Sequence, residues 1–355
     1  MSESTSSLDE RLLESAVGTL EMFGVYLGRK LGLYPAISEA GSVTPAELAG
    51  ATGIHERYAR EWLEQQAVSG YLTVTGESAD AGQRSYGLSE EQAAVLVRED
   101  DLAHVSPLAS MVAGIATVLD QVVDAYRTGD GVPYLAYGHD FRAGQGGINR
   151  PAFTSDLITD WIPSAPDVHK KVTREKVRIA EVGCGQGWAA IALASAYPNA
   201  EVIGIDADPA SIADGERFAA ERGVNVRFEN VPGESIADHG PFDVVFVLET
   251  LHDVARPVEM LSSIRKSLGH DGVVFVADER VAESFGAPGD LLERMMYGWS
   301  ITHCLPASMA EQPSAALGTV LRSDTVRRLG LEAGYEKVDV LDTDAGFFRL
   351  YTLSR

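Results

Sequence analysis

The amino-terminal part of the chain alternates polar and apolar positions with the period of an α-helix. Apolar side chains recur every three or four residues at Leu8, Leu12, Ala16, Leu20, Phe23, Leu27 and Leu31. This spacing predicts a long amphipathic helix over residues 8–32. Its apolar face is larger than a small domain can cover alone, which favours pairing with a second copy of the chain.

Two shorter helices and two strands are expected after this helix. Thr44-Pro-Ala-Glu47 has the pattern of a capping box with proline at the first helical position, and a further helix is expected at about residues 55–69. Residues 71–75 and 84–88 have the composition of strands. Helix, turn, helix and wing together predict a winged-helix domain over residues 1–100.

Residues 101–170 have a different character. Residues 107–126 predict one apolar helix, and the Gly- and Tyr-rich residues 129–139 predict a loop. Aromatic and basic side chains gather here: Arg127, Tyr134, Tyr137, His139, Phe141 and Arg142. This mixture is typical of a lid over a pocket, and also of an ordinary surface connection, so both interpretations stay open.

The remaining residues, 171–355, alternate short apolar runs with helical patterns, which predicts an α/β domain. The first run, residues 177–182, ends in glycines at Gly183, Gly185 and Gly187, and an apolar helix follows at once. A strand that breaks into glycines before a helix lets a ligand approach bare backbone at the helix N-terminus. Glu181 places a carboxylate there that would repel a pyrophosphate and attract an ammonium group.

The next apolar run ends in an acid, Asp206, about twenty residues after the glycines, where doubly wound folds use a carboxylate to bind ribose hydroxyls. Asp206 could also cap the helix that starts at Pro209. Asp208 fits that role better, because it directly precedes the proline at the first helical position. Asp206 is therefore expected to be free for a sugar.

EVGCGQG (181–187) followed by VIGIDAD (202–208) resembles the first two motifs of class I S-adenosylmethionine-dependent methyltransferases. The resemblance continues through four further strand segments: FDVVFVLETLHDV (242–254), GVVFVADE (272–279), YEKVDVLDT (335–343) and AGFFRLYTL (345–353). The whole chain resembles actinobacterial winged-helix methyltransferases. This implies a seven-stranded, doubly wound Rossmann-like domain that binds S-adenosylmethionine and releases S-adenosylhomocysteine.

The resemblance also implies a set of cofactor-binding residues. They are Glu181, Gly183, Cys184, Gly185, Gly187, Asp206, Ala207, Asn230, Gly233, Glu234, Ser235 and Leu248. Residues 226–235 lack the Asp that usually holds the adenine amino group in this family. Asn230, Gly233, Glu234 and Ser235 are the groups available there instead.

Two histidines are candidates for catalysis. Leu-His-Asp at His252 and Asp253 resembles the base-bearing motif of phenolic O-methyltransferases. Ligands of open α/β sheets bind beyond the carboxyl ends of the strands, which selects Glu181, Gly183, Asp206, residues 249–253, Asp278 and Glu279. Among these, His252 alone has an ordinary pKa near neutrality. His303 shares the apolar stripe of a helix expected at residues 289–303, which Pro306 is expected to end. His303 is then either a core histidine or part of the acceptor pocket.

Other functions remain open at this stage. Some α-keto acid C-methyltransferases resemble the chain at both histidines, which implies an alternative in which His252 and His303 hold a metal that stabilises an enolate. A metal-free general base is the preferred interpretation. An NAD-type dehydrogenase and a non-catalytic regulator that senses the methyl donor are further alternatives.

Composition narrows the partners and the compartment. The 355 residues include 52 acidic against 29 basic side chains, a net charge of −23, which argues against DNA, RNA or an anionic membrane as partner. The amino-terminal domain is acidic too, which favours dimerisation over DNA binding, as in the methyltransferases that it resembles. Two cysteines, the lack of a long apolar run and a polar start without signal-peptide character predict a cytoplasmic protein.

Overall fold

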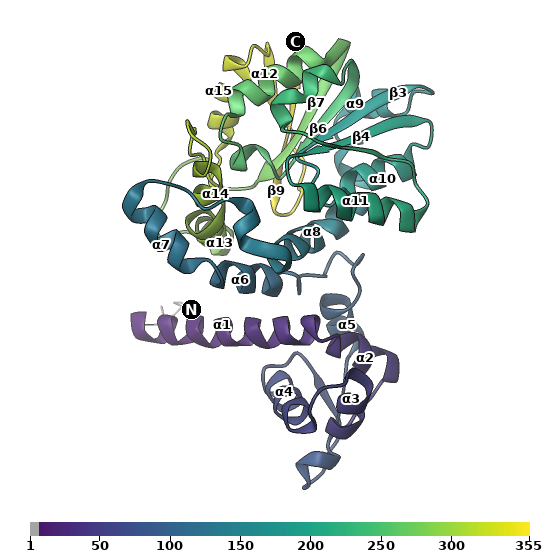
Figure 1. Cartoon of the computed structure of the whole chain (residues 1–355), viewed down its shortest axis with the longest axis vertical. Helices are drawn as coiled ribbons and strands as arrows, with labels where there is room; N and C mark the ends of the chain where they lie inside the picture. Colours follow the sequence, from purple (N-terminus) through teal and green to yellow (C-terminus); the bar gives the residue numbers. More distant parts are fainter. Residues whose placement is uncertain (1–6) are drawn as a thin grey trace. The chain divides into compact units, whose positions relative to one another are not determined.

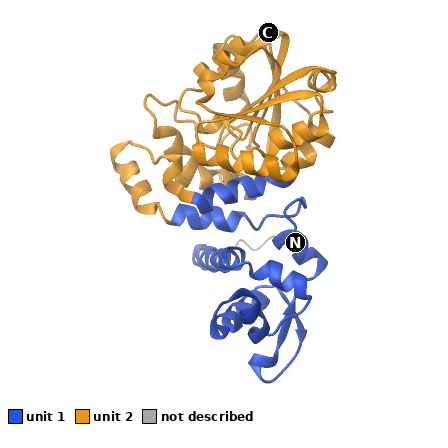
Figure 2. Cartoon of the chain, turned by 45° about the vertical axis from the view of Figure 1, so that its right-hand side comes forward, with its two compact units in different colours: residues 1–116, 139–151 blue, residues 117–138, 152–355 orange. Residues whose placement is uncertain are grey.

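The computed structural model describes residues 7–355, which form two compact units. Figure 2 colours the units separately. Unit 1 comprises residues up to 116 and residues 139–151, and unit 2 comprises residues 117–138 and 152–355. A segment of the polypeptide that precedes the sheet in sequence, residues 117–138, therefore belongs to the unit that contains the sheet.

Unit 1 is a helical domain with a small two-stranded wing (Figure 1). Its elements are α1 (Leu8–Lys30), α2 (Leu33–Ala40), α3 (Pro45–Thr52), α4 (Glu56–Val68), β1 (Thr73–Gly76), η1 (Ala81–Gln83), β2 (Ser85–Gly87), α5 (Glu90–Leu96), α6 (Leu108–Ala116) and most of α8 (Gly138–Thr154). The capping box predicted at Thr44 and Glu47 is present, with Pro45 in the first turn of α3. β1 and β2 pair antiparallel, so the predicted winged-helix arrangement is confirmed.

Unit 2 is built on a seven-stranded sheet. Its strands are β3 (Val177–Val182), β4 (Ala200–Asp206), β5 (Arg227–Asn230), β6 (Phe242–Leu248), β7 (Leu268–Glu279), β8 (Lys337–Val340) and β9 (Phe348–Ser354). The order across the sheet is β5-β4-β3-β6-β7-β9-β8. β3 to β7 pair in parallel, and β9 runs antiparallel to both of its neighbours. The predicted doubly wound sheet is confirmed, and its order reverses direction between β3 and β6.

Helices cover both faces of this sheet. The helical elements of unit 2 are α7 (Leu119–Thr128), η2 (Tyr134–Tyr137), η3 (Leu157–Trp161), α9 (Pro166–Val172), α10 (Trp188–Ala196), α11 (Pro209–Arg222), η4 (Gly233–Asp238), η5 (Leu251–Asp253), α12 (Pro257–Ser267), α13 (Leu291–Trp299), η6 (Ser300–Cys304), α14 (Leu305–Met309) and α15 (Ser323–Glu332). One core joins Ile179 and Val244 of the sheet to α9 and α10, and a second joins Ala180 and Val245 to α12 and α15. The alternation of side chains along each strand supplies apolar groups to both layers.

Three local expectations were wrong. The helix expected at residues 107–126 is two helices, α6 and α7, because Val118 leaves the helical conformation with φ −118° and ψ 7°. The loop expected at residues 129–139 contains η2 and ends where α8 begins, at Gly138. Pro306 does not end the insertion helix: Leu305 keeps helical angles, and the π turn η6 carries the chain into α14.

One result concerns membranes. Among residues 7–355, no single helix is long and apolar enough to cross a membrane, and the broken pair α6 and α7 meets only the criteria of combined length and composition.

Candidate active site

The turn from β3 into α10 depends on glycine. Gly183, Gly185 and Gly187 all have positive φ, between 50° and 77°, a region that other residues rarely adopt. A Cβ at Gly183 would lie 2.2 Å from Thr250 of the next parallel strand connection. Thr250 Oγ1 instead donates a hydrogen bond to the Gly183 carbonyl, so the turn lies tightly against the end of β6. Gly183 and Gly185 are half-buried, so part of the turn remains accessible at this end of the sheet.

Asp206 ends β4 and ties the glycine turn to the next connection. Its Oδ2 accepts the Gly185 N–H at 2.8 Å, and its Oδ1 accepts the Asp208 N–H at 2.8 Å. Burial raises the pKa of Asp206, and these two hydrogen bonds oppose the rise. Asp208 caps α11 as predicted, but Asp206 is not free: each oxygen already accepts one bond and keeps one further lone pair.

Other cofactor-binding candidates lie around this turn. Asn230, at the end of β5, donates from its side chain to the Asp206 carbonyl at 3.0 Å. Glu234 instead faces α12, where it forms an ion pair of 3.1 Å with Arg256. Ser235 and Gly233 begin η4, and Gly233 packs against Val182. Ala207 is exposed, whereas Cys184 and Leu248 are buried.

Glu181 lies inside β3 and is 1% exposed. Its Oε2 accepts the Ala190 N–H of α10 at 2.7 Å. Burial raises the pKa of Glu181 to about 8, against the opposing effect of that hydrogen bond. The carboxyl therefore anchors the first turn of the helix that follows the glycines.

His252 lies just beyond β6, in η5, and is 2% exposed. Its Nδ1 lies 2.9 Å from Oδ1 of Asp278 at the end of β7, and its Nε2 lies 3.4 Å from Oδ1 of Asp253. A carboxylate can only accept, so Nδ1 carries the proton of the bond to Asp278. Burial alone would lower the pKa of His252, but the charges of Asp253 and Asp278 outweigh it and raise the pKa well above its ordinary value.

His303 lies in the π turn η6 and is 3% exposed. Its ring meets the edges of two tyrosines from residues 117–138: Tyr137 at 4.5 Å between centroids and Tyr134 at 5.8 Å. Burial lowers the pKa of His303 to about 3, and the charge of His252 acts in the same direction. His303 is therefore a neutral imidazole near neutral pH.

The π turn is held in place by the segment that contains these tyrosines. In an α-helix the Thr302 carbonyl would accept the N–H four residues later, but residue 306 is proline and has none. The Tyr137 hydroxyl donates to that carbonyl instead, at 3.0 Å. Nearby, Tyr126 donates to the Ile301 carbonyl and Val132 donates to the Pro306 carbonyl. Two of the residues expected in a lid, Tyr134 and Tyr137, thus contact the candidate histidine.

Sequence reasoning missed the part that Cys304 takes in this region. Cys304 follows His303 directly, and one ligand atom each from His252, Asp253 and Cys304 lie within 4.8 Å of one another. The sequence analysis interpreted the Cys304 thiol only as evidence for a reducing compartment, although its position next to a candidate histidine was a signal for a role in the site. Burial raises the pKa of Cys304 to about 12, with Asp253 acting in the same direction.

Two of the residues selected for their position after a strand, Glu249 and Glu279, lie next to the His252–Asp278 pair; Glu279 is buried and Glu249 is partly buried. Glu279 ends β7, and Glu249 follows β6 with a φ of 50°. Burial raises the pKa of Glu279 well above its ordinary range, and the neighbouring Glu249 carboxyl adds to the rise. Their position after neighbouring strands predicted that they lie at the same end of the sheet, since parallel strands end at the same edge.

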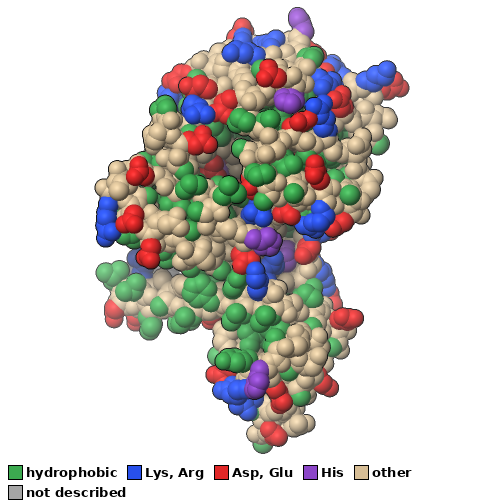
Figure 3. All heavy atoms as spheres, in the orientation of Figure 1, with side chains coloured by type: hydrophobic (Ala, Val, Ile, Leu, Met, Phe, Trp, Pro, Cys, Tyr) green, Lys and Arg blue, Asp and Glu red, His purple; other side chains and the backbone are tan. Residues whose placement is uncertain are grey.

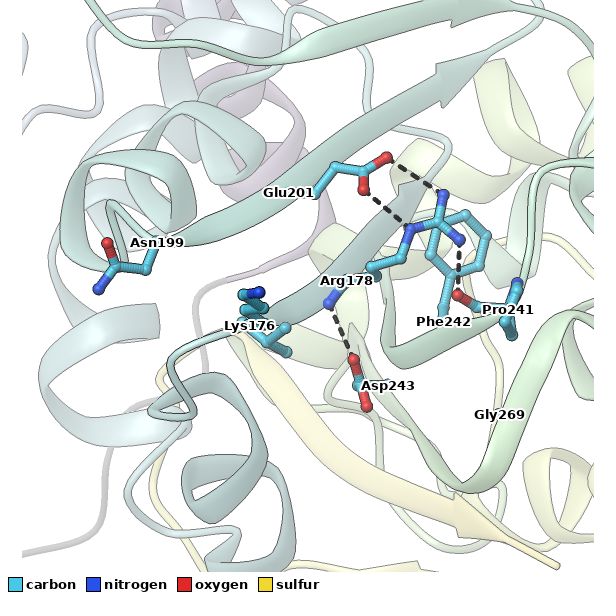
Figure 4. Close-up of a pocket in the computed structure, with 9 residues that line it drawn as sticks. Lys176, Arg178, Asn199, Glu201, Pro241, Phe242, Asp243 and Gly269 are labelled. Atoms are coloured by element: carbon cyan, nitrogen blue, oxygen red, sulfur yellow. Dashed lines mark hydrogen bonds and ion pairs between the residues drawn. The ribbon is translucent and has the colours of Figure 1, made fainter.

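The opposite end of the sheet has a cavity of about 490 Å³ (Figure 4). It is lined by Lys176, Val177, Arg178, Asn199, Glu201, Pro241, Phe242, Asp243 and Gly269, at the amino ends of the strands. Arg178 makes two hydrogen bonds to Glu201 and one to the Pro241 carbonyl. Ligands of open parallel sheets bind at the carboxyl ends, so this cavity is not the candidate site.

Comparison with known proteins matches two parts of the chain to families. Residues 173–316 match a family described as "Methyltransferase domain", and residues 20–98 match a family described as "Rv2258c-like winged HTH domain". A ubiquinone biosynthesis O-methyltransferase of Cereibacter sphaeroides is 32% identical over 122 residues, which are 34% of this chain and 49% of that protein. One of Caulobacter vibrioides is 32% identical over 105 residues, 29% of this chain and 41% of that protein. The chain spans about half the length of these curated relatives or less.

Solved structures share the fold over the whole chain. Human N-acetylserotonin methyltransferase in complex with SAM has a TM-score of 0.70 at 17% identity, with 100% of this chain and 99% of that chain covered. A putative O-methyltransferase of Nostoc punctiforme has a TM-score of 0.71 at 15% identity, with 99% and 100% covered. At such identities the likeness is one of fold. Together with the two family matches, it shows that this chain carries a methyltransferase domain at residues 173–316, preceded by an Rv2258c-like winged HTH domain at residues 20–98.

Proposed function

We propose that this chain transfers a methyl group from S-adenosylmethionine to an oxygen or carbon of a small organic acceptor and releases S-adenosylhomocysteine. One observation carries the proposal. The glycine turn, with Asp206 bonded to Gly185, and the His252–Asp278 pair follow strands that end at the same edge of the sheet. The proposed donor site and the proposed proton acceptor would therefore lie at the same edge of the sheet.

The donor would lie across the ends of β3, β4 and β5. Glu181, Gly183 and Cys184 would receive its methionine part, and Asp206 and Ala207 would receive the ribose. The lone pairs that remain on Asp206 suit the two ribose hydroxyls. Asn230, Gly233, Glu234 and Ser235 would line the adenine side, with Gly185, Gly187 and Leu248 closing the site. Since Glu234 is paired with Arg256, Asn230 is the better candidate for a polar contact.

The chemistry needs little beyond alignment and removal of one proton. The sulfonium is already activated, so the acceptor attacks the methyl carbon as the carbon–sulfur bond breaks, leaving a neutral thioether. The acceptor proton goes to Nε2 of His252, while Asp278 holds Nδ1 and orients the ring. His303, as a neutral imidazole, would be a second polar contact for the acceptor. Asp253 would stabilise the positive charge that His252 acquires.

Calorimetry with S-adenosylhomocysteine and with NADH tests the choice of cofactor. Binding of the former in the micromolar range or tighter, without binding of NADH, is the expected result. The reverse pattern would contradict the proposed donor and favour a dehydrogenase. If the product binds but no acceptor mixture yields S-adenosylhomocysteine from the methyl donor, the chain is a regulator that senses the donor.

We also propose a cytoplasmic homodimer that uses α1 and binds neither nucleic acid nor membrane. Apolar side chains are exposed along α1: Leu8, Leu12, Leu13, Val17, Leu20 and Leu27. Figure 3 shows apolar side chains, in green, over this helix. An exposed apolar surface of this kind is costly to leave in water, which favours its burial against a second copy of the chain. The acidic charge supports the absence of nucleic-acid and membrane binding, and the two free cysteines support a cytoplasmic location.

We propose the following division of the chain: residues 1–100 for dimerisation, 101–170 for a linker and lid, and 171–355 for catalysis.

Sedimentation at micromolar protein concentration tests the dimer. Leu12→Glu combined with Leu20→Glu should give monomers, whereas Val68→Glu, at an exposed apolar position on α4, should leave the dimer intact. A monomeric wild type would remove this proposal, and sequence-specific retardation of a DNA duplex would revive a regulatory role for the winged helix.

A further inference from the structure

Three potential metal ligands of different kinds meet beyond the end of β6. His252 and Asp253 come from η5, and Cys304 comes from the π turn η6, about fifty residues later in the chain. One ligand atom from each lies within 4.8 Å of the other two. His252 and Cys304 are buried, and Asp253 is partly exposed.

We propose that His252, Asp253 and Cys304 form a binding site for a zinc-type divalent cation. The separation of 3.4 Å between His252 Nε2 and Asp253 Oδ1 supports this geometry. Nitrogen and oxygen ligands at ordinary zinc distances, on two corners of a tetrahedron, lie about 3.3 Å apart. Cys304 Sγ, which lies within 4.8 Å of both atoms, would move closer to complete a three-ligand site with one open position.

Asp278 supports the same arrangement from outside the cluster. It accepts the Nδ1 proton of His252 at 2.9 Å, so Nε2 is the nitrogen that faces Asp253 and would bind the ion once its own proton is lost. A carboxylate that holds the far nitrogen of a metal-binding histidine is a recurrent feature of zinc sites. Asp253 Oδ1, moreover, is a buried atom whose contact with His252 Nε2, at 3.4 Å, a cation between the two would replace.

The mixture of donors selects the kind of ion. An imidazole, a carboxylate and a thiol suit borderline ions such as Zn²⁺ and Co²⁺, whereas Mg²⁺ and Ca²⁺ prefer oxygen ligands alone. His303 is not in this set, and within residues 7–355 no group of three or more candidate ligands includes it. The ligands proposed here therefore differ from the His252–His303 pair considered from the sequence.

A bound ion would change what His252 can do. The metal would occupy Nε2, the nitrogen that the proposed function uses to accept the acceptor proton. Zinc would therefore inhibit methyl transfer, and chelation would restore it. This consequence rests on the proposed function, but the binding of the ion does not.

Metal binding can be measured on the purified full-length protein without donor or acceptor, so its result is independent of the proposed function. Zn²⁺ is titrated against a chromophoric competitor after chelator treatment, and Co²⁺ is titrated with detection of the thiolate-to-metal absorption band. We expect one ion per chain and a Co²⁺ spectrum that contains thiolate. Cys304→Ala and His252→Ala should each weaken binding of Zn²⁺ by at least about tenfold.

Cys184→Ala is the matched control, because it removes the other buried cysteine of the chain and should leave Zn²⁺ binding unchanged. Cys304→Ser provides a second variant if Cys304→Ala fails to fold. Absence of stoichiometric binding to the wild type, or a Co²⁺ complex without a thiolate band, would overturn the proposal. Equal affinity in wild type and Cys304 variants would also overturn it, since the ion would then sit on other acidic groups.

Discussion

The two ends of the central sheet carry charged side chains in opposite ways. At the amino ends, Arg178 of β3 pairs with Glu201 of β4, and Lys171 and Arg174 both pair with Asp271. At the carboxyl ends, several carboxyl groups surround the imidazole of His252. The first arrangement neutralises each charge with an opposite one, and the second concentrates like charges in a buried place.

The pKa values follow this difference. Glu201 is exposed, and its hydrogen bonds to Arg178 lower its pKa, so this carboxylate stays ionised. Burial and the neighbouring Glu249 raise the pKa of Glu279, at the other end of the sheet. Opposite charges in contact with water stabilise a fold modestly, whereas buried groups with displaced pKa values are typical of functional sites. The comparison therefore separates a structural end of the sheet from a chemical one.

Removal of the His252 imidazole should have the largest effect on the rate of methyl transfer. His252→Ala should lower the rate of methyl transfer by about 10²–10⁴-fold, the usual contribution of a general base. Turnover is measured by formation of S-adenosylhomocysteine with any acceptor that the wild type methylates. Arg178→Ala, at the amino end, should keep the wild-type rate. Normal turnover of the His252 variant would mean that the site acts through alignment alone, with Asp253, Asp278 and Glu279 the next groups to test.

The two ends of one strand, β4, provide the next test. Asp206→Ala should weaken binding of S-adenosylhomocysteine by about 1.5–3 kcal/mol, because it removes charge-assisted hydrogen bonds to the ribose and to the glycine turn. Glu201→Gln, near the start of the same strand, should leave the affinity unchanged. Calorimetry gives both values. An Asp206 variant with wild-type affinity would exclude this residue from the donor site.

Buried Glu181, near the carboxyl end of β3, should make the stability of the protein depend on pH. Its pKa is about 8 in the folded protein and close to 4.5 when unfolded, so the folded state binds the extra proton between these pH values. Stability of the wild type should therefore fall as pH rises from about 5 to 8, by at most about 1.4 kcal/mol per pH unit. Glu181→Gln lacks this loss, so its melting temperature relative to the wild type should rise over that range. A difference independent of pH would show that Glu181 is ionised throughout.

The smallest expected effect is a shift of the pH–rate profile. Because the carboxylates hold the pKa of His252 above its ordinary value, the rate should increase with pH as the imidazolium loses its proton. Asp278→Asn removes one of these charges but still accepts the Nδ1 proton, so the rising limb should move to lower pH. Asp271→Asn at the amino end serves as the control and should not move it. An unmoved limb in the Asp278 variant would assign the titration to another group.

The sequence determined the elements whose signals are local. The glycine turn needs positive φ at three positions, and only glycine supplies this freely, so residues 183–187 predicted both the turn and its place after a strand. The same is true of Asp206 at the end of β4 and of His252 after β6. Parallel strands end at one edge, and so position along each strand was enough to bring these residues to the same end of the sheet.

Only the tertiary structure decided how the side chains meet. Asp278 contacts His252 because β6 and β7 are neighbours, and their separation in sequence carries no record of a distance of 2.9 Å. Cys304 reaches the same cluster through a π turn that continues past Pro306, where local rules predicted a break. Tyr137 compensates for the missing N–H of that proline by donating to the Thr302 carbonyl, which lies 165 residues later in the chain than the tyrosine. Local propensity describes a residue and its neighbours in sequence, whereas such contacts depend on which surfaces pack together when the chain folds.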